Sequence, residues 1–309
     1  MVAGSVAAIG NFDGVHRGHR ALLEAASGHA ASLSAPLGVV VFDPHPRRFF
    51  RPDDPAFMVM TPHDRDALLR GAGVASVARL PFNDALSQMT PAEFVHDVLA
   101  KQLGLRGVIT GREFRFGKGR AGDTDALASL CQEAGISAFA LDPVPAQSGG
   151  QKIGSSAIRT ALQAGDVGDA ADMLGRPWSV YGVIEEGQKL GRQIGFPTAN
   201  MRLGDIIEPK FGVYAIEIAL EAETELSPDD ATTLKGVANF GRRPTVGSDA
   251  PLLEVHIFDF TSDLYGKALR VYFRDFIRPE MKFDGVGALT QQIARDVEAA
   301  RAFFATGGA

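Results

Sequence analysis

Residues 6–19, VAAIGNFDGVHRGH, join a short apolar run to a glycine-rich turn and then to a helical pattern. Short apolar runs of this kind are typical of strands buried in a parallel sheet. A strand that turns directly into a helix is the first unit of an open α/β sheet. The stretch therefore predicts a strand over Val6–Ile9 and a helix immediately after the turn.

The same alternation continues through the first half of the chain. Further strands are predicted over Leu37–Phe42, Val74–Leu80, Arg106–Thr110 and Ile136–Leu141. Helices are predicted over Arg20–Ala26, Asp64–Leu69, Ala92–Gln102, Thr124–Glu133, Ser156–Ala164 and Val167–Leu174. Thr90, Pro91 and Glu93 supply a capping box for the third of these helices. We expect an α/β domain built on a doubly wound parallel sheet.

After Arg176 the apolar residues alternate with a period of two. Strands are predicted over Val213–Ala219, Lys235–Asn239, Leu252–Phe260 and Leu269–Phe273. This pattern indicates a small antiparallel β-barrel or sandwich. A terminal helix over Leu289–Phe304 is expected to pack Ile293, Val297 and Phe304 against it. We predict two domains, residues 1–176 and 177–309.

The bulk composition narrows the class of protein. A formal net charge of −6 argues against a general nucleic-acid binder. The single Cys131 cannot form an internal disulfide, which fits a reducing cytoplasm and excludes cysteine-cluster metal sites. No apolar run is long enough to cross a membrane, and the N-terminus does not have the pattern of a signal peptide. We expect a cytoplasmic protein whose partners are small molecules, with neither nucleic acid nor membrane among them. The sequence does not determine the oligomeric state.

His16-Arg17-Gly18-His19 stands where the first strand would turn into a helix. A helix N-terminus offers backbone N–H groups and a partial positive charge to a phosphate, and the histidines add donors. Gly18 would let the backbone approach closely, while Gly10 and Gly14 would permit the sharp turn. Two surface histidines that merely open a helix are the alternative, and the preceding strand and turn argue against it.

Three further segments carry groups suited to a nucleotide. FDPHP at residues 42–46 follows a buried strand, at the edge where open α/β sheets bind ligands. GREFRFGKGR at residues 111–120 interleaves cations with aromatic rings, although a solvated basic loop is the simpler interpretation. In KIGSSAIR at residues 152–159, two serines would cap a helix flanked by Lys152 and Arg159, which is also the make-up of an ordinary helix cap.

The second half holds a glycine-rich segment, residues 187–200, that ends in Pro-Thr-Ala-Asn. Its glycines would let N–H groups wrap a polyphosphate. Thr198 and Asn200 are neutral oxygen ligands of the kind that Mg²⁺ takes beside phosphate oxygens. A hairpin turn fits the segment equally well. Further on, the strand period of LEVHI at residues 253–257 puts Glu254 and His256 opposite the apolar side chains. Glu254 is therefore the candidate base for a hydroxyl nucleophile, unless it simply faces solvent.

The motifs of the first half, taken in order over residues 6–175, resemble the adenylyltransferase half of bacterial bifunctional riboflavin kinase/FAD synthetases. They are GNFDGVHRGH, FDPHP, GREFRFG and SSAIR. The resemblance implies transfer of AMP from ATP to FMN, with pyrophosphate released. It implies catalytic roles for His16 and His19, with Phe116 on the flavin side. The implied nucleotide-binding residues are Gly10, Asn11, Phe12, Asp13, Gly18, Lys152, Ser155, Ser156 and Arg159. Two departures are Glu113, where relatives often carry Asp or Asn, and Gly154, where Ser is common.

The motifs of the second half, over about residues 180–300, are similar to the riboflavin kinase module of the same family. They are GRQIGFPTAN, FGVYA, GVANFGRRPT, LEVH, DLYG and RPEMKF. The resemblance implies a six-stranded barrel in which Gly191 and Gly195 bind the nucleotide and Thr198 and Asn200 hold Mg²⁺ with ATP. It also implies that Glu254 activates the ribityl 5′-hydroxyl. The loop that carries Arg278 and Glu280 would close over the flavin. Phe211 and Phe240 are departures that affect packing only.

Together these motifs predict a bifunctional enzyme. Riboflavin and ATP would give FMN and ADP, and FMN and ATP would then give FAD and pyrophosphate, with Mg²⁺ in both steps. A chain with one working half is one alternative, and a non-catalytic flavin or nucleotide sensor is another. The presence of Thr198, Asn200, Glu254, His16 and His19 argues against both.

Overall fold

The computed structural model describes residues 2–143, 152–185, 194–220, 229, 233–242, 251–262 and 264–307. It divides into two compact units. The first comprises Met1–Pro55 and Pro62–Gly154, and the second comprises Ala56–Thr61 and Ser155–Ala309. The compact units thus part at Gly154, before the helices that the sequence assigns to the first domain. The boundary at residue 176 stays a prediction.

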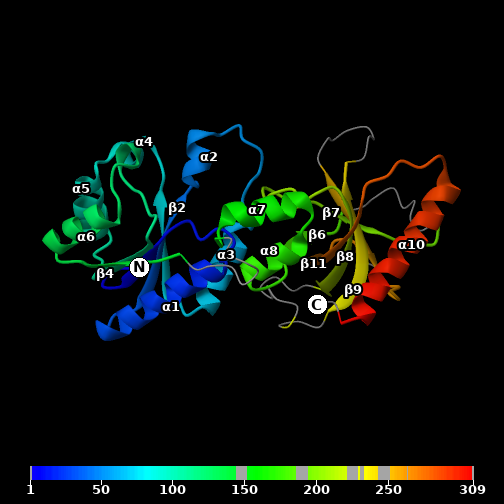
Figure 1. The fold of residues 1–309 in the computed structure, drawn as a ribbon, viewed down its shortest axis with the longest axis horizontal. Coiled ribbons are helices and arrows are strands. Elements are labelled where there is room, and N and C mark those ends of the chain that lie inside the picture. The colour runs from blue at the N-terminus through cyan, green and yellow to red at the C-terminus, as the bar shows by residue number, and fades with distance from the viewer. Residues whose placement is uncertain are drawn as a thin grey trace. The chain divides into compact units, whose positions relative to one another are not determined.

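The first unit is built on five parallel strands in the order β3-β2-β1-β4-β5 (Figure 1). The strands are β1 (Val6–Ile9), β2 (Leu37–Asp43), β3 (Ser76–Pro81), β4 (Gly107–Gly111) and β5 (Ser137–Leu141). Each lies within two residues of a predicted strand, so the doubly wound sheet is confirmed. From β1 the chain first builds outward through β2 and β3, then returns to the other side of β1 as β4. The order of the strands therefore reverses between β1 and β4.

Helical segments connect these strands. They are α1 (Arg17–Ser32), α2 (Pro46–Phe50), α3 (Pro62–Gly71), α4 (Asp84–Gln88), α5 (Pro91–Glu93), the π-helix η1 (Phe94–Gln102), the 3₁₀ turn η2 (Lys118–Arg120) and α6 (Thr124–Glu133). The capping box is confirmed, because Thr90 and Glu93 exchange hydrogen bonds between side chain and backbone. The sequence did not predict α2 and α4. Neither has a buried residue, so neither leaves an apolar period in the sequence.

The second unit is a near-closed antiparallel barrel with the strand order β6-β11-β8-β9-β10-β7. Its elements are α7 (Ser155–Ala164), α8 (Val167–Leu174), β6 (Ser179–Val183), β7 (Ala199–Met201), β8 (Gly212–Leu220), β9 (Leu234–Gly241), β10 (Leu252–Ile257), β11 (Ala268–Pro279) and α10 (Val286–Ala305). A bridge between Glu185 and Asn200 brings the two edges of the sheet together. The predicted barrel is confirmed, while β6 and β7 were missed.

The terminal helix α10 packs on β8 and β9 (Figure 1). Val297 and Phe304 join a cluster of apolar side chains that includes Val213 and Val237. These two contacts were predicted. Ile293, one turn earlier on the same face, instead lines a cavity between the helix and the barrel.

A short segment from the first half of the chain, Ala56–Thr61, belongs to the second unit. The Trp178 indole Nε1 donates a hydrogen bond of 2.7 Å to the Val59 carbonyl. The Arg159 Nε donates one of 2.7 Å to the Phe57 carbonyl. The side chains of Phe57 and Val59 are buried. The segment is therefore part of the core of the second unit, and no periodicity in the sequence predicted this.

Candidate active sites

The first cavity lies at the carboxyl ends of β1, β4 and β5 and has a volume of about 220 Å³. This is where the strand order reverses, and open α/β sheets bind their ligands at such a point. Gly10, His16, Gly18, His19 and Lys152, all predicted site residues, line the cavity. The first predicted site is therefore brought together at one edge of the sheet.

The turn that leads into this cavity is strained. Phe12 has φ of 53° and Val15 has φ of 39°, a region that L-residues, and above all β-branched ones, seldom adopt. Gly14 also has a positive φ, as expected, but Gly10 does not. Gly10 therefore does not adopt the left-handed conformation, and the non-glycine residues Phe12 and Val15 do so beside Gly14. Such strain costs roughly 1–3 kcal/mol per residue and persists where burial enforces it, and both side chains are fully buried.

His16 and His19 form a stacked pair at the start of α1. His16 is the N-cap of the helix, and its Nδ1 accepts a hydrogen bond of 3.2 Å from the backbone N–H of His19. Because Nδ1 accepts, the proton of a neutral His16 ring lies on Nε2. The two ring centroids are 3.6 Å apart. The backbone and the imidazoles therefore form one rigid group of donors beside the cavity.

Burial, and secondly the nearby His16, hold the pKa of His19 well below its usual range. His19 is therefore neutral at pH 7. Its Nδ1 is buried without a hydrogen-bond partner among the described residues, as is the Asn11 Oδ1 in the preceding turn. Buried polar atoms normally find partners, so two such atoms in this turn indicate groups that a ligand satisfies.

The rim of the cavity carries two ion pairs. Lys152 Nζ pairs with the Glu113 carboxylate, and Arg112 Nε lies 2.9 Å from Asp142 Oδ1. All four side chains are exposed, so solvent and salt screen both pairs and each is weak. A polyphosphate can therefore compete with the carboxylates for these cations at little energetic cost.

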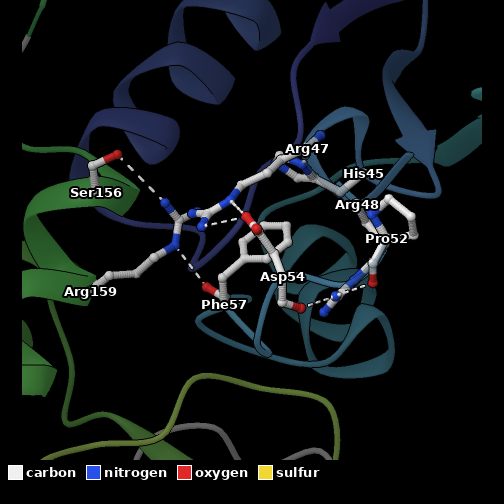
Figure 2. A network of polar contacts seen from close by, with 8 residues as sticks. All are labelled: His45, Arg47, Arg48, Pro52, Asp54, Phe57, Ser156 and Arg159. Carbon is white, nitrogen blue, oxygen red and sulfur yellow. Dashed lines mark hydrogen bonds and ion pairs between the residues drawn. The ribbon is translucent and has the colours of Figure 1, made fainter. Parts of the chain in front are cut away.

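Four predicted residues of the first site, Phe116, Ser155, Ser156 and Arg159, are not among those that line this cavity. Phe116 is buried in the core beside Phe94 and Phe114, and Phe114 lines the cavity in its place. Ser155 and Ser156 lie in the first turn of α7, in the second unit. There Arg159 Nη1 donates a hydrogen bond of 3.5 Å to Ser156 Oγ. Figure 2 draws this contact as a dashed line.

Figure 2 also shows the loop that follows FDPHP, in the first unit. Arg47 donates two hydrogen bonds to the Asp54 carboxylate, at 3.0 and 2.9 Å. Arg48 donates to the backbone carbonyls of Pro52 and Asp54. The two arginines that follow the motif thus close the chain from α2 to Asp54 into a compact loop.

The second cavity lies between the barrel and α10 and has a volume of about 200 Å³. Most of its lining is apolar, with Val213, Val237 and Phe283 among the walls. The polar side chains that line it include Thr198, Asn239, Glu254, His256, Arg278 and Glu280. An apolar slot with a few converging polar groups is the usual form of a small-molecule site.

A row of polar residues crosses three strands, and two of them, Glu254 and Asn239, line this cavity. Glu254 on β10 pairs in register with Asn200 on β7 and with Asn239 on β9. Its neighbours Leu253 and Val255 are buried, so the predicted alternation of β10 is confirmed. The Asn200 Oδ1 is buried and has no hydrogen-bond partner among the described residues. Glu254 thus meets residues that are 54 and 15 positions away in the sequence because the strands pair.

The start of the RPEMKF loop is anchored to α10. Arg278 donates two hydrogen bonds to the Asp296 carboxylate, at 2.8 and 2.7 Å, and Gln292 adds a third at 2.9 Å. Two residues after Arg278, desolvation raises the pKa of Glu280, while a hydrogen bond from Asn239 and the charge of Arg278 oppose that rise. Arg278 and Glu280 thus line the cavity as expected, and each is held by a partner on another element.

Some predicted residues of the second site cannot be placed. Gly191 lies outside the described residues, and so does most of its glycine-rich segment. Gly195 is described and has φ of +86°, a conformation that favours glycine. Two polar residues at the cavity were missed by the sequence analysis. Asn239 lies inside the GVANFG motif, which could have drawn attention to it, whereas Asp296 has no signal beyond its place on an amphipathic helix.

The cavity of the parallel-sheet unit is lined by histidines and cations, and that of the barrel unit by carboxylates and an apolar wall. Together they indicate a transferase with two sites.

Two family models match the chain, FAD synthetase over residues 2–157 and riboflavin kinase over residues 174–304. Bifunctional riboflavin kinase/FMN adenylyltransferases match nearly its whole length. That of Pseudomonas fluorescens is 40% identical, covering 98% of this chain and 94% of its own. That of Escherichia coli K12 is 38% identical, with coverages of 97% and 93%.

A solved structure has the same fold. It is a crystal structure from Streptococcus pneumoniae described as a macrolide-efflux protein, 29% identical, with a TM-score of 0.85 over 97% of this chain and 94% of that one. That description concerns the Streptococcus protein. In the part of the present chain that the structure describes, no helix has the length and apolar character needed to cross a membrane.

This chain belongs to the family of bifunctional riboflavin kinase/FMN adenylyltransferases. It phosphorylates riboflavin to FMN with ATP and then transfers AMP from a second ATP to FMN, which gives FAD and pyrophosphate.

Proposed function

We propose that riboflavin is phosphorylated in the cavity of the second unit, with Glu254 as the general base, and that FMN is adenylylated in the cavity of the first unit. The row of Asn200, Glu254 and Asn239, of which Glu254 and Asn239 line the second cavity, supports this assignment. It brings one carboxylate next to neutral oxygen groups, beside an apolar slot that suits a flat aromatic ring.

In the kinase step the isoalloxazine ring lies against the apolar walls and the ribityl chain extends toward Glu254. The Glu254 carboxylate accepts the proton of the 5′-hydroxyl as that oxygen attacks the γ-phosphorus, and ADP leaves. The loop that begins at Arg278 excludes water from the flavin. Its anchor on Asp296 gives that loop a fixed starting point.

A divalent cation fits the residues on the phosphate side of this cavity. Asn200 presents a buried, unpartnered oxygen, and the Thr198 hydroxyl lines the cavity. Among the described residues no three His, Cys, Asp or Glu side chains cluster as metal ligands. Mg²⁺ suits such a site, because it takes few protein ligands and completes its shell with phosphates and water. When bound, the ion neutralises charge on the phosphates. We propose Mg²⁺ for the adenylyl transfer as well.

In the adenylyl transfer an FMN phosphate oxygen attacks the α-phosphorus of ATP and pyrophosphate leaves, without a covalent enzyme intermediate. The N-terminus of α1, with Nε2–H of His16 and the neutral His19, donates hydrogen bonds where negative charge develops. The strained turn from Gly10 to Asp13 positions these donors. Lys152, Ser155, Ser156 and Arg159 are proposed to bind the polyphosphate, and Phe116 stays a proposed flavin contact. The cytoplasmic location and the absence of a nucleic-acid partner also stay predictions.

Replacing single residues tests the assignment of one reaction to each cavity. In Glu254→Gln, FMN formation from riboflavin should fall by about 10²–10⁴-fold, because the base is lost. The same protein, supplied with FMN, should still make FAD. The flavins are separated by chromatography over time. Asp259→Asn, which removes an exposed carboxylate outside the cavity, is the matched control and should change neither rate. Loss of both activities in Glu254→Gln, or full FMN formation, would contradict the assignment.

A further inference from the structure

His256 lies on β10, two residues after Glu254 and on the same face, and it lines the second cavity. Its Nδ1 is 2.8 Å from the backbone carbonyl oxygen of Pro197. A carbonyl can only accept a hydrogen bond, so the imidazole donates through Nδ1–H. The bond therefore fixes which ring nitrogen carries the proton, and it ties β10 to the residue immediately before Thr198.

The hydrogen bond between His256 and Pro197 links β10 to the segment before β7 just beyond the end of the ladder between these two strands. The ladder between β7 and β10 has three residue pairs and ends at the pair of Ala199 and Val255. The next positions along are Thr198 and His256, and Pro197 beyond them has no N–H with which to extend a ladder. The Phe196 ring meets the His256 ring edge-on, with 5.6 Å between centroids. His256 thus contacts two consecutive residues of the segment that leads into β7.

We propose that His256 is a positioning residue of the kinase site, which holds the segment of residues 196–198 so that the Thr198 hydroxyl and the Asn200 oxygen face the cation and the phosphates. The inference rests on the proposed function, which places those two oxygens on the nucleotide side. Groups that orient metal ligands are commonly worth about 10–100-fold in metal affinity. His256 itself touches neither the reacting hydroxyl nor the phosphates in this role.

Three substitutions at His256 distinguish the effect of the hydrogen bond to Pro197 from the effect of the size of the ring. In His256→Asn the amide nitrogen occupies nearly the position of Nδ1, so the bond to Pro197 can be kept. In His256→Gln the amide nitrogen lies nearer the position of Nε2, and in His256→Ala no donor is left. Each variant is examined by hydrogen exchange of backbone amides in residues 194–201, and by titrating the kinase reaction with Mg²⁺ at fixed riboflavin and ATP.

In His256→Ala, amides of residues 194–201 should exchange faster, and the Mg²⁺ concentration at half-maximal rate should rise about tenfold. The KM for riboflavin should stay unchanged, as should FAD formation from supplied FMN. His256→Asn should restore both the slow exchange and the Mg²⁺ dependence, and His256→Gln should not. If the alanine variant fails to fold, the contrast between Asn and Gln gives the same test.

Two results would overturn the inference. In the first, His256→Asn keeps slow amide exchange in residues 194–201, but its kinase reaction is as impaired as that of His256→Ala. This would show that the imidazole acts on the chemistry directly. The other is an equal rise in the KM for ATP and for riboflavin together with a lower Tm, which would show a general packing role. Thr198→Ala in the same titration tests the proposed function separately. An unchanged Mg²⁺ dependence there would remove the ligand role of Thr198, whatever the exchange data for His256 show.

Discussion

The two cavities assemble their polar groups in opposite ways. At the first, ten consecutive residues supply the strained turn, the helix cap and both histidines, so the geometry is local. At the second, Thr198, Asn239, Glu254 and Glu280 come from four separate segments, and strand pairing brings them together. The first site is therefore sensitive to backbone conformation at one turn, and the second to how strands and α10 pack.

The sharpest test of the first site is at His16. It distinguishes the role of this side chain as the N-cap of α1 from its role as a hydrogen-bond donor to the substrate. In His16→Asn the side-chain oxygen can still cap α1, but no Nε2–H remains. FAD formation from FMN should fall by about 10²–10³-fold in both His16→Asn and His16→Ala. Only the alanine variant should also lose about 1 kcal/mol of unfolding free energy, because its cap is gone. The control is the riboflavin kinase activity of the same variants. Full FAD synthesis by His16→Asn would show that His16 does not act as a donor in the adenylyl transfer.

The packing-dependent site is tested at the pair of Arg278 and Asp296. Asp296→Asn leaves the largely buried Arg278 without its bidentate carboxylate. The unfolding free energy should fall by about 2 kcal/mol, less than the 3–5 kcal/mol typical of fully buried pairs. The KM for riboflavin should rise about tenfold, equivalent to 1.4 kcal/mol, as the loop loses its anchor.

A matched control is an exposed ion pair to the same helix. Asp259→Asn breaks the exposed pair that Asp259 forms with Arg301 of α10, and this should cost less than about 1 kcal/mol. Urea unfolding and riboflavin kinetics measure both variants. Equal effects of the two substitutions would show that the anchor of the loop does not matter for binding the flavin.

A smaller effect is expected at Gly18, where the local geometry is tight. A Cβ added there would lie 3.2 Å from two atoms of the His16 ring, so the ring must shift by a few tenths of an ångström. Gly18→Ala should slow FAD formation by roughly tenfold, because catalysis is sensitive to misplacements of this size. Gly28→Ala on the same helix meets nothing within 4 Å and should leave the rate unchanged. Equal rates in the two variants would show that the ring position is not critical.

The smallest effect concerns pH. The pKa of His19 is lowered in the folded protein, so below about 6.5 the unfolded state binds the extra proton first. The unfolding free energy should therefore decrease as the pH falls below about 6.5 and should be fully retained above it. In His19→Asn this decrease should be shallower. Urea unfolding at several pH values between about 5 and 8 measures the difference. Parallel curves for the two proteins would show that burial of His19 does not couple to stability.

Elements with a strong local signal could be predicted from the sequence. The five strands of the sheet, the capping box at Thr90 and the alternation around Glu254 all follow from periodicity or from local hydrogen-bonding chemistry. The elements that were missed lack that signal. β7 has three residues and exists because β10 pairs with it, while α2 has no buried face.

The sites show the same limit. His16 and His19 were found because their motif is contiguous, and the resemblance supplied the role of Glu254. The left-handed conformations of Phe12 and Val15 could not be predicted, because residues of these types seldom adopt them. Asp296 was missed because its partner Arg278 lies 18 residues away and their pairing is a tertiary contact.

The segment Ala56–Thr61 has a consequence for how the protein is synthesised. Its partners Arg159 and Trp178 follow their contacts in the sequence by 102 and 119 residues. At about 5–20 residues per second, the ribosome delivers them roughly 5–25 seconds after the segment has emerged. During that interval the nascent chain carries Phe57, Val59 and Met60 without the structure that later buries them. The second unit therefore cannot complete its core until Arg159 and Trp178 have been synthesised, long after the segment that they bind.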